Sequence, residues 1–120
     1  MSHLVTVATQ VRDPVAVEAA CRRLGLAVPI PGTAQLYSGE ATGLLLQLPD
    51  WLYPLVLDLS TGTMHYDNYG GAWGEQVHLD KFLQMYAVEK TRLAARSQGY
   101  AVTEQALDDG SIRLVIQEGC

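Results

Sequence analysis

The sequence predicts a single α+β domain in which two helices pack on a mostly antiparallel sheet. Three observations carry this prediction: two capped helical segments, a strand-rich middle divided by Gly and Pro, and a final pair of strands around an Asp-Asp-Gly turn. A decorated ferredoxin-like arrangement is one form that this order of elements allows. Nothing that resembles a linker or a repeat divides residues 1–120, so we expect one domain.

Both helices have recognisable ends in the sequence. Asp13 is a good N-cap and Pro14 is tolerated in a first turn, so a helix is expected over 13–24, before Gly25. A second, longer helix is expected over 75–97. It has a periodic apolar stripe, and Gly99 follows its end.

Most of the other segments have the composition of strands. Residues 3–11 are rich in β-branched side chains, and the runs LYSG, GLLLQL, YPLVLDL and TMHYD are separated by short turns. GLLLQL and YPLVLDL lack alternation, which favours strands that are covered on both faces. YAVTEQAL and SIRLVIQ form the clearest hairpin, whereas Pro29, Pro31 and Gly32 are expected to interrupt the chain.

Composition excludes some classes of function. The chain is 48% hydrophobic and 18% charged, which is a globular balance, and its net charge of -5 disfavours nucleic acid as a partner. The segment MSHLVTVATQ lacks the pattern of a signal peptide and no long apolar run follows, so we expect a cytoplasmic protein without a membrane partner. Cys21 and Cys120 do not have the spacing of metal ligands, and no disulfide between them is expected.

Residues 64–78 (MHYDNYGGAWGEQVH) concentrate the side chains that could perform chemistry. Glu75 and His78 are spaced i, i+3 on one helical face, and His65 and Asp67 lie upstream, so the four could form an acid–base or metal cluster. The Glu-x-x-His motif occurs once, however, and no nucleophile motif accompanies it. GGAWG lacks the spacing of a dinucleotide loop. We therefore expect no metal and no cofactor, and assign no catalytic residue.

The same loop has a simpler structural interpretation. Asn68 and the three glycines of NYGGAWG supply backbone conformations that other residues resist. Tyr69 and Trp73 then either pack the loop onto the sheet or are presented to a protein partner, since both residue types are enriched in interfaces. At least one of the two rings is expected to be substantially exposed.

Several motifs together resemble a known family. The N-terminal MSH with its following strand, the YDNYGGAWG loop, the helix HLDKFLQMYAVEK and the ending GYAVTEQALDDGSIRLVI occur in this order. They resemble the hypothetical chloroplast reading frame thirty-five proteins and their bacterial relatives, a family of unknown function. The resemblance implies no catalytic residue. It does imply an accessory or adaptor role, associated with an AAA-type ATPase system.

The leading hypothesis is thus a small cytoplasmic binding or adaptor module that acts through Tyr69 and Trp73. The alternative is a small enzyme or metal-binding protein that uses His65, Asp67, Glu75 and His78. A protein partner is expected, and self-association stays open. The two hypotheses differ in space, because the enzyme requires these four side chains in one pocket whereas the adaptor requires exposed aromatic rings.

Overall fold

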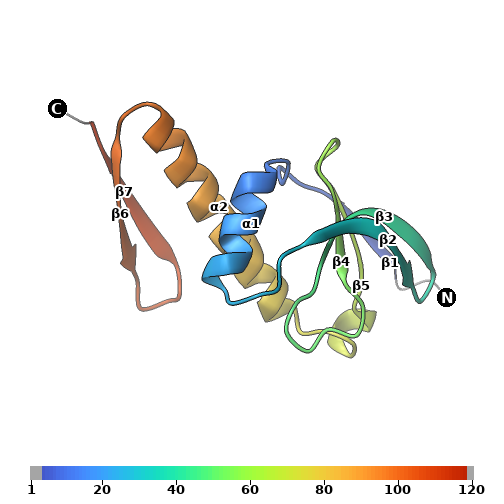
Figure 1. Cartoon of the computed structure of the whole chain (residues 1–120). Coiled ribbons are helices and arrows are strands. Elements are labelled where there is room, and N and C mark those ends of the chain that lie inside the picture. Colours follow the sequence, from blue (N-terminus) through green and yellow to red (C-terminus); the bar gives the residue numbers. More distant parts are fainter. Residues whose placement is uncertain (1–3, 119–120) are drawn as a thin grey trace.

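The computed structural model describes residues 4–118 and has the predicted α+β class. Two helices pack on a five-stranded antiparallel sheet, and a separate two-stranded hairpin follows (Figure 1). In chain order the elements are β1 (Leu4–Ala8), α1 (Pro14–Arg23), β2 (Ile30–Leu36), β3 (Gly39–Leu46), β4 (Leu55–Asp58), β5 (Thr63–Asp67), the short 3-10 helix η1 (Tyr69–Gly71), α2 (Gln76–Ser97), β6 (Ala101–Ala106) and β7 (Ile112–Gln117).

The five-stranded sheet has the order β1-β5-β4-β3-β2, and each of its pairings is antiparallel. After β1, helix α1 takes the chain to the far edge of the sheet. The meander from β2 to β5 then returns it to β1. Helix α2 leads out of this sheet to β6, whereas the second helix of the ferredoxin-like β-α-β-β-α-β order connects two strands of the same sheet.

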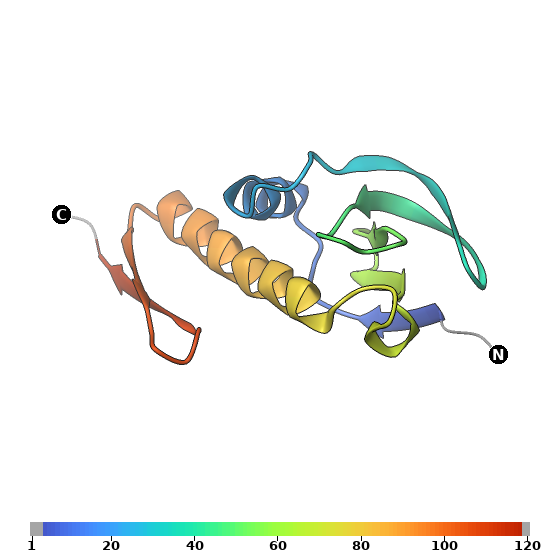
Figure 2. The ribbon, with the colours of Figure 1, turned by 90° about the horizontal axis from the view of Figure 1, so that it is seen from below.

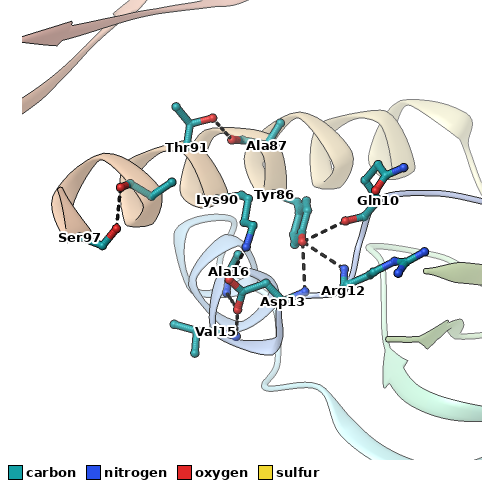
Figure 3. Close-up of polar contacts among 11 residues, drawn as sticks. Gln10, Arg12, Asp13, Val15, Ala16, Tyr86, Ala87, Lys90, Thr91 and Ser97 are labelled. Carbon is teal, nitrogen blue, oxygen red and sulfur yellow. Dashed lines mark hydrogen bonds and ion pairs between the residues drawn. The ribbon is translucent and has the colours of Figure 1, made fainter. Parts of the chain in front are cut away.

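Both predicted helices are confirmed, and their ends follow the expected chemistry. The Asp13 carboxylate accepts hydrogen bonds from the backbone amides of Val15 and Ala16, which satisfies amides at the start of α1. Gly25, with φ 71°, follows the end of that helix. The hydroxyl of Tyr86 on α2 accepts from the amides of Arg12 and Asp13 and donates to the Gln10 carbonyl, so it ties α2 to the start of α1 (Figure 3).

The expected break at Pro31 and Gly32 is wrong, because both lie within β2. Strand β2 is at the edge of the sheet and pairs with β3 alone, and a proline is tolerated there because its missing N–H can face the open side of the sheet. Gly43 on β3 lies close to the backbone of Leu57 on β4, where a Cβ would collide with the Leu57 carbonyl. The β2–β3 hairpin is long, and it curves along its length (Figure 2).

The two faces of the sheet have different environments. The inner face, which we define as the face under the helices, holds the large core of Leu46, Leu55, Leu57, Met64, Tyr66 and Trp51 against Val17 and Cys21 of α1 and Leu79 and Phe82 of α2. The opposite, outer face holds a smaller cluster of Ala34, Leu36, Ala41 and Val56. Strand β4 is thus buried on both faces, as its lack of alternation predicts.

The molecule is elongated, with extents of 56 × 32 × 23 Å. The five-stranded sheet lies at one end and the β6–β7 hairpin at the other, with α2 between them (Figure 1). No helix within residues 4–118 combines the length and the apolar character that crossing a bilayer requires.

Candidate functional site

The loop that follows β5 folds back on itself through its own backbone. The Trp73 amide donates to the carbonyl of Asn68 at 2.9 Å, and the Asn68 side-chain amide donates to the Gly74 carbonyl at 3.4 Å. Gly70 and Gly71 have φ angles of 61° and 106°, so the expected use of glycine here is confirmed. The loop therefore presents Tyr69 and Trp73 from a compact turn.

Trp51 fixes the base of this loop to the inner core. Its Nε1 donates to the carbonyl of Glu75 at 3.0 Å, and its ring lies edge-on to Tyr66 with a centroid distance of 5.7 Å. Gly74 packs so closely on the Trp51 ring that a Cβ would collide with it. One residue further, the Leu52 amide donates to the Trp73 carbonyl at 2.8 Å, which joins the loop to the segment before β4.

The Trp73 ring is the centre of an aromatic group that we call the Trp73 cluster: Tyr37, Tyr53, Tyr69 and Trp73. Ring centroids lie 4.6 Å from Trp73 for the stacked Tyr69, 5.1 Å for Tyr37 and 5.8 Å for Tyr53. Tyr37 comes from the β2–β3 turn and Tyr53 from the segment before β4, so the cluster joins three distant parts of the chain. Tyr53 also packs against the outer-face apolar cluster, which places the Trp73 cluster over the outer face.

Much of this cluster is open to solvent. Tyr37 is 60% exposed and Tyr69 47% exposed, and the neighbouring Leu52 is 61% exposed. Trp73 itself is partly buried. The expectation that at least one of Tyr69 and Trp73 is substantially exposed is therefore confirmed.

The strand register places His65 and Asp67 on the outer face of β5. His65 is opposite Val56 of β4 and Thr6 of β1, and its Nδ1 lies 3.0 Å from the Thr6 hydroxyl. Asp67 is opposite Leu4, and the side chain is fully buried. Neither carboxylate oxygen of Asp67 has a hydrogen-bond partner.

Glu75 and His78 lie elsewhere, at the start of α2. Glu75 is the exposed N-cap residue, and its side chain makes no capping hydrogen bond. His78 lines an apolar pocket with Leu24 and Lys81, on the helical side of the molecule. The structure thus divides the four residues of the enzyme hypothesis into two pairs. No group of three or more His, Cys, Asp or Glu side chains within residues 4–118 is placed to hold a metal ion.

Two other sequence features are placed by the structure. Cys21 is a free thiol whose pKa is raised to about 11, first by burial and then by the charge of Glu18, so it is a poor nucleophile near neutral pH. Cys120 lies outside the described residues. Arg23, the last residue of α1, forms ion pairs with Glu89 on α2 and Glu104 on β6.

No family model, no curated protein and no solved structure matches the chain significantly. The resemblance to the chloroplast reading-frame family therefore stays a prediction, as does the adaptor role that it implies.

Sequence reasoning missed Tyr37 and Tyr53 as members of the cluster. Both lie outside the loop, and the fold brings Tyr37 from the β2–β3 turn and Tyr53 from the segment before β4 to Trp73. No local pattern reports such a contact. A second missed feature, the distribution of charge along the chain, is visible in the sequence and bears on the chemistry of a partner.

Proposed function

We propose that this chain is a protein-binding module of the adaptor type, and that the Trp73 cluster together with Leu52 is its docking surface. The observation that supports this proposal is the exposure of Tyr37 and Tyr69 around a Trp73 ring that they contact directly. Tyr and Trp dominate interface hot spots, because each buries a large rigid surface with little loss of side-chain entropy.

The arrangement also favours an adaptor over the enzyme alternative. An acid–base or metal site requires converging side chains, but His65 and Asp67 lie on the outer face whereas His78 lies in a pocket on the helical side. Exposed apolar side chains that adjoin one another are typical of protein-interaction sites. The AAA-type ATPase system implied by the family resemblance is the first partner class to test.

The test is site-specific photo-crosslinking in a native lysate. A benzoylphenylalanine photoprobe at the position of Tyr69 should form a discrete adduct with a partner. The same probe at the position of Arg22, whose side chain is 73% exposed on α1, should not. Adding Trp73→Ala to the Tyr69 probe should remove the adduct, since truncating a hot-spot residue costs about 2 kcal/mol or more of binding.

Two outcomes would contradict the proposal. One is an adduct that forms equally from both positions, and the other is an adduct that survives Trp73→Ala. Circular dichroism of the Trp73→Ala protein separates lost binding from lost folding. Tyr69→Ala provides a second variant, because Tyr69 is exposed and its truncation removes little buried surface.

A further inference from the structure

Charge is segregated along this chain. No Lys or Arg occurs between Arg23 and Lys81, a stretch that supplies β2 to β5 and the whole loop of the Trp73 cluster. The same stretch contains the carboxylates of Glu40, Asp50, Asp58, Asp67, Glu75 and Asp80. Strand β1 has no charged residue either. The strands of the five-stranded sheet therefore contain carboxylates but no Lys or Arg, and this end of the molecule is acidic.

The cations of the chain form their ion pairs on the helical side. Arg23 and Arg92 both bind Glu104, and Lys90 binds Asp13 at 3.0 Å (Figure 3). Arg12 reaches the sheet, but its guanidinium donates to the carbonyl of Thr61. None of these ion pairs includes a carboxylate between residues 24 and 80.

Asp67 is the exceptional member of the acidic set, because it is 0% exposed and both of its oxygens lack a hydrogen-bond partner. Its side chain is on the outer face, where Tyr53 and through it the Trp73 ring also lie. The next residue, Asn68, accepts the hydrogen bond from the Trp73 amide. Glu40, three residues after Tyr37 in the β2–β3 hairpin, is instead exposed, so its charge faces the solvent close to the Tyr37 turn.

We propose that the Trp73 cluster recognises a basic segment of its protein partner, with an Arg or Lys side chain stacked on the exposed aromatic rings and an apolar neighbour on Leu52. This inference rests on the proposed function and specifies its partner. Aromatic faces attract cations, and Arg also stacks on them through its planar guanidinium. The exposed carboxylate of Glu40 contributes the attraction of a negative charge close to the Tyr37 turn. The acidic sheet end adds to the field that steers a basic segment toward the rings.

Fluorescence anisotropy with a labelled peptide of alternating arginine and leucine tests whether negative charge on this protein contributes to binding. Glu40→Gln should weaken binding of this peptide about threefold or more, because it removes an exposed negative charge close to the Tyr37 turn. Asp108→Asn changes the net charge equally at the far hairpin end, and should weaken binding less than about twofold. A peptide of alternating glutamate and leucine should not bind. Equal losses in the two variants, or equal binding of the two peptides, would overturn the inference.

A second pair of variants tests the stacking of a cation on an aromatic ring. Both variants are at an exposed residue, where a substitution does not threaten folding. Tyr69→Phe keeps the ring face and should preserve binding of the arginine–leucine peptide, whereas Tyr69→Leu keeps apolar bulk and should weaken it about threefold or more. Equal binding by these two variants would remove the cation–ring contact from the inference.

The outcomes also separate this inference from the proposed function. If the crosslinked partner still depends on Trp73 while Glu40→Gln changes nothing, the docking surface stands and its preference for basic segments is wrong. If the partner does not depend on Trp73 at all, the proposed function itself is wrong.

Discussion

The two faces of the five-stranded sheet each have one tryptophan, and the two tryptophans have different surroundings. On the inner face Trp51 is 4% exposed, donates its Nε1 hydrogen to a carbonyl and contacts Gly74. On the outer face Trp73 is stacked against Tyr69, which is nearly half exposed. Burial and a satisfied donor are typical of a residue that stabilises the fold, and an exposed ring group is typical of recognition.

Polar groups follow the same division. On the helical side, carboxylates such as Glu104 and Asp13 are paired with cations of the same chain. On the outer face, Asp67 is buried with neither oxygen bonded. A buried polar group without a hydrogen bond costs free energy, so its presence at one place indicates a role other than stability. The helical side thus pairs Glu104 and Asp13 with cations, whereas the outer face combines an unbonded buried carboxylate with exposed aromatic rings.

The largest expected effect is that of Trp51→Ala, which should lower the free energy of unfolding by about 3–5 kcal/mol. The substitution removes a fully buried ring and its hydrogen bond to the Glu75 carbonyl. Trp73→Ala should cost clearly less, because the Trp73 ring is only partly buried. Urea denaturation of both variants measures the difference. Equal losses would remove the distinction between the two tryptophans.

Gly74→Ala comes next, with an expected loss of about 1–3 kcal/mol from overpacking against the Trp51 ring. Gly70→Ala is the matched control on the same loop. A Cβ at Gly70 meets open space, so only its φ of 61° opposes the change, at about 1 kcal/mol. Thermal unfolding of the pair tests whether the packing on Trp51, rather than backbone conformation, dominates at this end of the loop.

Glu104→Gln should lower stability near neutral pH by about 1–2 kcal/mol, because two arginines lose their shared carboxylate. The hydrogen bonds from Arg23, followed by the charges of Arg23 and Arg92, hold the pKa of Glu104 below its ordinary value of 4.5. A carboxylate with a lowered pKa stabilises the fold fully above its unfolded-state pKa, and this stabilisation is lost as the pH falls through the folded-state pKa.

The stability difference between wild type and Glu104→Gln should therefore be constant above about pH 5.5 and shrink progressively below pH 4.5. Denaturation curves recorded across this range provide the measurement. A difference that does not change with pH would show that the ion pairs of Glu104 contribute nothing and that the loss has another origin.

Asp67→Asn should not lower the free energy of unfolding, because neither carboxylate oxygen has a hydrogen bond to lose and the two side chains are nearly equal in size. Asp13→Asn keeps an N-cap residue but loses the ion pair with Lys90, so it should lower stability by about 0.5 kcal/mol. Chemical denaturation of both variants compares the two faces directly. A loss of stability in Asp67→Asn would mean that the carboxylate has a stabilising role in the fold.

Much of the fold could be predicted because its signals are local. The Asp13-Pro14 start of α1 and the strand Thr63–Asp67 are confirmed, as is the hairpin around the Asp-Asp-Gly turn. Caps, turns and apolar periodicity act within a few residues, so one sequence is sufficient to find them. Strand β2 was missed because a proline is tolerated only at a sheet edge, and edge position is a tertiary property.

The candidate site was predictable only in part. Tyr69 and Trp73 could be found because they share one glycine-rich loop. The separation of His65 from His78 could not, because it depends on which face of β5 and which side of α2 each side chain occupies. Burial of Asp67 likewise depends on the neighbouring strands. The absence of Lys and Arg from residues 24–80 could be found without a structure, by counting the charged residues of each segment of the sequence.

The smallest expected change in stability is at Tyr69. Its φ of 48° lies in the left-handed region that a bulky side chain rarely adopts, so the backbone is strained there. Asn tolerates this conformation, and Tyr69→Asn exchanges the loss of a half-exposed ring for relief of strain. We expect its free energy of unfolding to stay within about 0.5 kcal/mol of wild type. Partner binding should nevertheless fall, since the stacked ring is gone.

Tyr69→Phe is the control and should preserve both properties. A loss of about 2 kcal/mol in stability with binding unchanged would instead make Tyr69 a packing residue, because truncating a buried aromatic ring has a cost of that order.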